Sequence, residues 1–141
     1  MLKKTLWIIL MVGFIFLMSQ CHWFDPLRIQ VKVYYHGVGQ IEDVVVIAHA
    51  DKSPLGYFQP GEEKNTRLYP TNPVSDNNVD LRYTLTSSQR TRFWSTRNQI
   101  PGKGYNVEID ILGNDELIYR ACYRPCDISS LPWSGRLKTT D

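Results

Sequence analysis

Hydrophobic and polar positions alternate with a period of two over much of this chain. From Leu27 to Tyr35 the odd positions are apolar or aromatic, and most of the even positions are polar. Such alternation is typical of a β-strand with one buried face. The pattern recurs over residues 79–86, 105–111 and 117–123, whereas helical periodicity is nowhere sustained. The chain is therefore expected to be rich in antiparallel strands.

Turn residues separate these strands, and one further strand has a different pattern. Residues 44–48 are continuously apolar and mostly β-branched, which predicts a strand covered on both faces. Gly113, Asn114 and Asp115 are expected to join the last two strands, because Gly and Asn tolerate the positive φ of tight hairpins. Several short strands with such punctuation predict an all-β fold, an antiparallel sandwich of about seven strands over residues 27–126.

The run from Ile100 to Ile109 adds to this expectation. Here an apolar residue, a Pro and a Gly precede Tyr105 on an alternating strand. The run resembles the segment leading into the sixth strand of fibronectin type III and related immunoglobulin-like domains, which carries a tyrosine corner. The resemblance implies that Tyr105 folds back to hydrogen-bond the backbone. A transthyretin-like sandwich produces much the same pattern, so both topologies stay open.

The first twenty residues differ in composition from the rest. Lys3 and Lys4 precede an unbroken apolar run from Leu6 to Met18. This is the layout of a secretory signal, which is expected to form a hydrophobic helix. A full membrane span needs about 20 apolar residues, so the run is short for an anchor.

The residues from Leu17 to Cys21 resemble the bacterial lipobox. Ser19 fits that pattern, and Gln20 departs from it. The resemblance implies that residues 1–20 are a signal peptide, that Cys21 carries a diacylglycerol and palmitate as the new N-terminus, and that residues 21–26 are a short tether. The alternative is an uncleaved inner-membrane anchor running from Leu6 to Phe24.

The tether and the residue after the cysteine predict a location. Residues 22–26 reach at most about 18 Å at 3.3–3.6 Å per residue, so the domain is expected to lie close to the lipid surface. His22, and not an aspartate, follows Cys21. In the sorting pattern of bacterial lipoproteins this resembles an outer-membrane address, which places the domain on the periplasmic side of the outer membrane.

The other two cysteines, Cys122 and Cys126, are expected to form a disulfide. An exported protein meets an oxidising compartment, and acylation of Cys21 leaves these two as a pair. Pro125 favours a turn between them, and Cα atoms across such a turn can meet the roughly 4.4–6.8 Å that a disulfide requires. The spacing is not that of a redox or metal-binding CxxC motif.

Charge excludes one class of partner. The chain has 16 basic and 14 acidic side chains, and removal of residues 1–20 takes away two lysines and no acid. The balanced remainder argues against a nucleic-acid partner, since phosphates require concentrated positive charge. It argues equally against electrostatic adhesion to anionic lipid, so the acyl chains are expected to provide membrane attachment.

The sequence shows no convincing catalytic or metal site, and no cofactor is predicted. His49 and Asp51 would share a face if they lay on one strand, but no nucleophile motif accompanies them. The three histidines lack metal-ligand spacing. We therefore expect a chain that is not an enzyme.

The segment from Arg90 to Arg97 is the strongest candidate for protein binding. If it is extended, Arg90, Arg92 and Trp94 point one way and Arg97 the other. Arg and Trp are over-represented at binding hot spots. The alternative places Trp94 in the core and leaves the arginines in solvent.

The plan of the whole chain suggests a function. Signal, cysteine, short tether and compact β domain loosely resemble the periplasmic immunity lipoproteins found beside type VI secretion effectors. That resemblance implies a protein that neutralises a secreted toxin by binding it. The alternative is a structural or assembly accessory of an envelope secretion or surface machine. Residues 127–141 are mostly polar and are expected to form a loosely ordered tail.

Overall fold

The described part of the chain forms nine β-strands and one short 3-10 helix. The computed structural model describes residues 28–69, 78–96, 104–113 and 115–141, together with Trp7, Ile9 and residues 11–13, which are helical. No helix among these residues is long and apolar enough to cross a membrane. The elements are β1 (Ile29–Tyr35), β2 (Ile41–Ala48), β3 (Asp51–Phe58), β4 (Glu63–Leu68), β5 (Val79–Leu85), β6 (Arg90–Ser95), β7 (Tyr105–Gly113), β8 (Glu116–Tyr123), η1 (Ile128–Ser130) and β9 (Leu137–Lys138).

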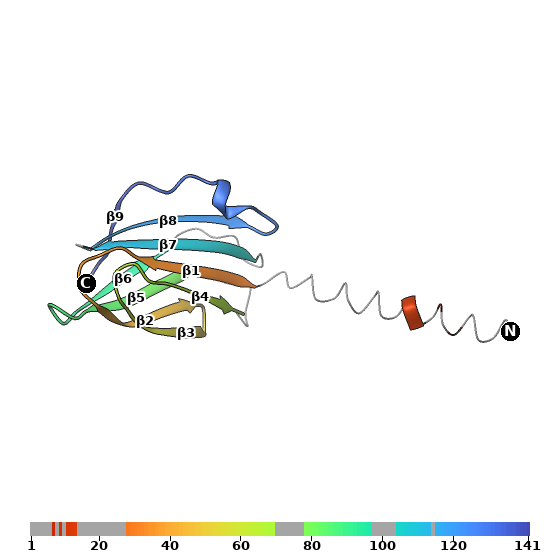
Figure 1. Cartoon of the computed structure of the whole chain (residues 1–141), viewed down its shortest axis with the longest axis horizontal. Helices are drawn as coiled ribbons and strands as arrows, with labels where there is room; N and C mark the ends of the chain where they lie inside the picture. Colours follow the sequence, from red (N-terminus) through yellow and green to blue (C-terminus); the bar gives the residue numbers. More distant parts are fainter. Residues whose placement is uncertain are drawn as a thin grey trace.

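The strands form two sheets stacked as a sandwich, so the predicted fold class is confirmed (Figure 1). One sheet has the order β4-β1-β7-β8-β9, and the other has the order β3-β2-β5-β6. All neighbours are antiparallel except β1 and β7, which are parallel. In an immunoglobulin sandwich the first two strands share a sheet. Here they lie in different sheets, so the strand arrangement differs from that of an immunoglobulin sandwich.

The alternation read from the sequence produces the core. In β1 every odd residue from Ile29 to Tyr35 is buried and every even residue is half-exposed, and β7 repeats the pattern. Among the described residues, all fully buried members of the hydrophobic core lie between Ile29 and Leu117. A chain beginning at residue 22 keeps all of these core residues, so we expect it to fold.

Strands β3, β4 and β9 were not predicted, and β2 was predicted with the wrong environment. β3 and β4 are edge strands with polar and exposed positions, and β3 contains Pro54, which a central strand would not tolerate. In β2 the prediction of burial on both faces is wrong, because Val45 and Ile47 are half-exposed. A bulge at Asp43, which has a φ of 51°, shifts the alternation of this strand.

Strand direction separates the two ends of the sandwich. The chain enters at Ile29, and β1 runs away from that point to Tyr35. β7 runs parallel to β1, and the remaining long strands alternate in direction. The connections at the opposite end, which we call the far end, are residues 36–40, 59–62, 86–89 and 113–115. The C-terminus also lies at the far end (Figure 1).

Buried tyrosines make the fold sensitive to high pH. Burial raises the pKa of Tyr83 to about 12, and the pKa of Tyr105 is raised for the same reason. Above pH 10 an unfolded tyrosine has lost a proton that the folded chain still holds, so the unfolded state binds fewer protons and stability falls as the pH rises.

We expect Tyr83 alone to lower the free energy of unfolding by up to about 1.4 kcal/mol per pH unit between pH 10 and pH 12. Urea titrations at several pH values in that window measure the slope. Tyr83→Phe should make the slope shallower. A slope that is unchanged in this variant would argue against the assignment.

Candidate functional site

Strand β6 carries the residues that the sequence singled out for protein binding. Arg92 and Trp94 point inward and are 6% and 7% exposed, whereas Phe93 between them is 39% exposed. Trp94 packs against Tyr119 of the other sheet, with ring centroids 4.9 Å apart. The assignment of Trp94 to a binding surface is therefore corrected: Trp94 belongs to the core, which was the alternative for this residue. Arg92 is buried but lines a pocket. Arg90 is exposed, and Arg97 lies outside the described residues.

The buried guanidinium of Arg92 is held by two carboxylates. Its Nε donates to Oδ1 of Asp115 at 2.6 Å, and its Nη2 donates to Oδ2 at 2.8 Å. Its Nη1 pairs with the carboxylate of Asp141. Bidentate pairing of this kind satisfies a buried arginine and fixes its orientation. The sequence of residues 90–97 alone does not indicate this pairing, because both carboxylates come from the C-terminal part of the chain.

A pocket of about 460 Å³ opens at the far end of the sandwich, between the two sheets. Arg90 and Arg92 both line it, so the structure does bring these two predicted residues together. The remaining lining comes from the far-end connections and the strand ends beside them: Tyr35, Val38, Leu85, Ser87, Ser88, Gly113 and Asp115. Loops set on a rigid sandwich are common places for binding sites.

Val38 is the most exposed large apolar side chain at this pocket. It is 99% exposed, yet its loop is held in place. The Tyr35 hydroxyl donates to the Val38 carbonyl at 3.2 Å. Gly113 packs so closely on the loop that an added Cβ would lie 2.9 Å from the Cα of Gly37. Val38 is therefore an exposed apolar residue that is held at the mouth of the pocket.

Tyr105 is fully buried at the start of β7. Its hydroxyl interacts with the side chain of Thr96, which follows β6 in the other sheet. Its ring lies edge-on to that of Tyr123, with centroids 6.3 Å apart. The backbone bond of a tyrosine corner stays a prediction, because residues 100–103 lie outside the described part of the chain.

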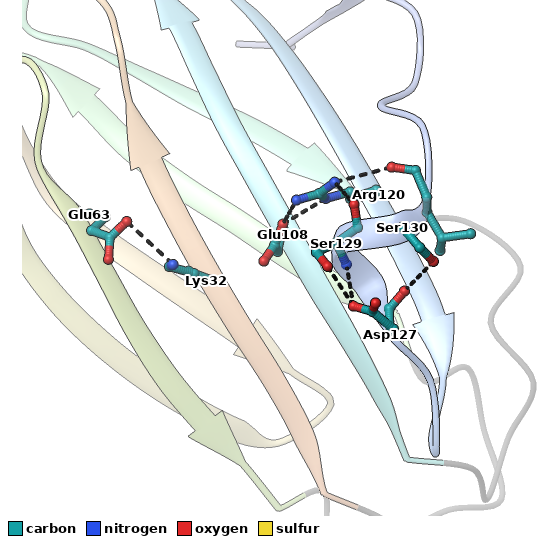
Figure 2. Close-up of polar contacts among 8 residues, drawn as sticks. Lys32, Glu63, Glu108, Arg120, Asp127, Ser129 and Ser130 are labelled. Carbon is teal, nitrogen blue, oxygen red and sulfur yellow. Dashed lines mark hydrogen bonds and ion pairs between the residues drawn. The ribbon is translucent and has the colours of Figure 1, made fainter.

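The C-terminal segment is ordered, and the prediction of a loose tail is wrong. Arg120 forms an ion pair with Glu108 at 2.6 Å and donates to the carbonyls of Ser129 and Leu131 (Figure 2). Its guanidinium also stacks 4.4 Å from the centroid of the Trp133 ring. These contacts fasten the segment to the outer face of the five-stranded sheet.

Further contacts hold the C-terminal segment. Asp127 caps η1, and hydrogen bonds from the hydroxyl and the amide of Ser129 lower the pKa of its carboxyl (Figure 2). The predicted disulfide is present, with the Cα atoms of Cys122 and Cys126 at 6.2 Å. The segment then adds β9 to β8, and Thr140 pairs with Phe93 of the other sheet. The edges of β8 and β6 are thereby partly covered.

The residues weighed for catalysis have structural surroundings. His49 lies in the turn between β2 and β3 with a φ of 59°, so it does not share a strand with Asp51. The Asp51 carboxylate accepts from the Tyr69 amide at 2.8 Å. His36 pairs with Asp110 at 2.7 Å on the protein surface. Across the described ranges, no group of three His, Cys, Asp or Glu side chains could hold a metal ion.

Comparisons with known proteins give no family. No family model and no curated protein matches the chain. A solved structure described as the NMR structure of the protein from Eubacterium rectale aligns with 60% of this chain and 78% of its own, at 9% identity and a TM-score of 0.45.

Proposed function

We propose that this chain is an exported lipoprotein, anchored through acyl chains on Cys21, whose domain binds a protein partner at its far end. The observation that carries the proposal is the separation of two features. The chain enters the sandwich at Ile29, and the pocket with Val38 and Arg90 opens at the opposite end. Strands of seven to nine residues put roughly 23–30 Å between these ends, so an anchored domain presents the pocket away from the lipid.

Within this proposal, the partner is a secreted toxin and the chain is an immunity protein on the periplasmic side of the outer membrane. The alternative partner is a component of an envelope secretion or surface machine. The two differ in the consequence of deletion. Loss of an immunity protein harms cells only when its toxin is present, whereas loss of an accessory abolishes secretion or assembly.

Cys21→Ser is expected to release the domain from the membrane fraction, because several acyl chains make a durable anchor and none remains. Fractionation measures the release, and labelled palmitate should enter only the unchanged chain. Membrane association that persists in the variant would instead favour an uncleaved span from Leu6 to Phe24.

Site-specific cross-linking tests the far end. A photoreactive side chain at position 38 is expected to capture the partner in intact cells. The same group at position 93, which is also exposed but lies on the outer face of the four-stranded sheet, is the matched control. Equal capture at both positions would contradict a far-end interface. Mass spectrometry of the captured protein distinguishes a toxin from a machine component.

A further inference from the structure

The guanidinium of Arg92 is shared between one fixed carboxylate and one exposed carboxylate. Asp115 takes Nε and Nη2 in a bidentate pair, and its side chain is 37% exposed. Asp141 takes Nη1 through a single oxygen, and its side chain is 77% exposed. Replacing Asp115 would strip a buried charge of its main partner, which is costly. Exchanging Asp141 for another carboxylate preserves the ion pair and leaves the bidentate pair intact.

A second cation lies beside this position. Arg90 is two residues away on the same side of β6, about 6.6 Å along the strand. It is exposed, and its side chain has no hydrogen-bond or ionic partner among the described residues. Hydroxyl groups of Ser87 and Ser88 and the apolar side chains of Val38 and Leu85 complete the surroundings. The pocket therefore combines the positive charge of Arg90, the ion pair of Arg92 with Asp115, serine hydroxyl groups and apolar surface.

We propose that Arg90 and Nη1 of Arg92 form a carboxylate-binding subsite for an Asp or Glu side chain of the protein partner, and that Asp141 occupies the Arg92 position in the free protein. This inference rests on the proposed function and adds the chemistry of the partner. The partner's carboxylate replaces that of Asp141 on Arg92, so this exchange by itself adds little binding affinity. The affinity comes from the ion pair with Arg90 and from apolar contact with Val38 and Leu85. A free small anion cannot make the apolar contact.

The role of Asp141 follows from this competition. An internal carboxylate lowers the affinity of the subsite for acetate, phosphate and other small anions. A partner that carries an acidic residue beside an apolar one overcomes the competition by adding contacts. The subsite thereby discriminates against isolated anions, which is specificity by competition as well as by attraction.

The test uses the chain from residue 22 to residue 141, which retains the whole core. The probe is a capped Leu-Glu-Glu tripeptide, with capped Leu-Gln-Gln, acetate and inorganic phosphate as controls. Nuclear magnetic resonance follows the Nε–Hε signal of Arg92 and the amides of Val38 and Ser88. The acidic peptide should shift these signals at concentrations where the other three probes do not.

Variants separate displacement from general electrostatics. Asp141→Asn should tighten binding of the acidic peptide by about two- to fivefold, and Arg90→Gln should weaken it by a similar factor, the range for exposed ion pairs. Glu116→Gln is the matched control, because it removes the same charge from a residue that pairs with Arg136 outside the pocket. Equal tightening in Asp141→Asn and Glu116→Gln would overturn displacement at Arg92.

The outcomes also separate this subsite from the proposed function. Peptide binding without any cross-link from position 38 supports the subsite and contradicts the far-end interface. A specific cross-link from position 38 with no shift of the Arg92 signal overturns the subsite and leaves the interface in place.

Discussion

Trp94→Ala is expected to lower the free energy of unfolding by about 4 kcal/mol, within the range measured for truncation of buried aromatic residues. The side chain is 7% exposed and lies between the sheets against Tyr119. Its removal deletes buried apolar surface and leaves a cavity that two paired sheets cannot close by a small movement. The substitution also removes the aromatic contact that joins β6 to β8.

Phe93→Ala is the matched control for this prediction. Phe93 is the preceding residue of β6, but its side chain faces outward. Its backbone pairs with Thr140 whatever the side chain is, so we expect a loss of less than about 1 kcal/mol. Urea unfolding followed by fluorescence of the other tryptophans measures both variants. Losses of similar size at positions 93 and 94 would show that Trp94 is not a core residue.

The contrast between Phe93 and Trp94 shows that alternation along a strand can predict which side chains are buried. Alternation placed β1, β5 and β7 correctly, because each has one face in the core and one toward solvent. It also placed β8, whose alternate residues from Leu117 to Tyr123 pack in or against the core. β3 and β4 were not predicted, because edge strands need no continuous apolar face. The order of the strands could not be predicted from the alternation either, because the pairing of β1 with β4 and β7 joins segments far apart in the chain.

The far-end site was only partly predictable, for a related reason. Arg90 and Arg92 were singled out by residue type, and both line the pocket. Composition cannot distinguish an exposed arginine from one buried by Asp115 and Asp141, because that difference depends on which distant carboxylates arrive. The C-terminal segment was underestimated in the same way. Its polar residues bond to Arg120 and to Phe93 and so hold the segment on the domain.

Gly113→Ala is expected to lower the free energy of unfolding by about 2–4 kcal/mol, which adds two costs. Gly113 has a φ of +82°, and a non-glycine residue in that region costs roughly 1–2 kcal/mol. The added methyl group would also lie 2.9 Å from the Cα of Gly37. The obstacle is backbone, so relief requires the loop that carries Val38 to move away from the hairpin between β7 and β8.

Gly39→Ala separates these two costs. Gly39 has a φ of +81°, but nothing lies within 4 Å of an added methyl group, so we expect the conformational cost alone, roughly 1–2 kcal/mol. Thermal and urea unfolding of both variants give the difference. Because Gly113 and Val38 line the same pocket, Gly113→Ala should also weaken binding of the acidic peptide, whereas Gly39→Ala should have a smaller effect. Equal destabilisation by the two substitutions would mean that the close packing of Gly37 and Gly113 does not hold the far end together.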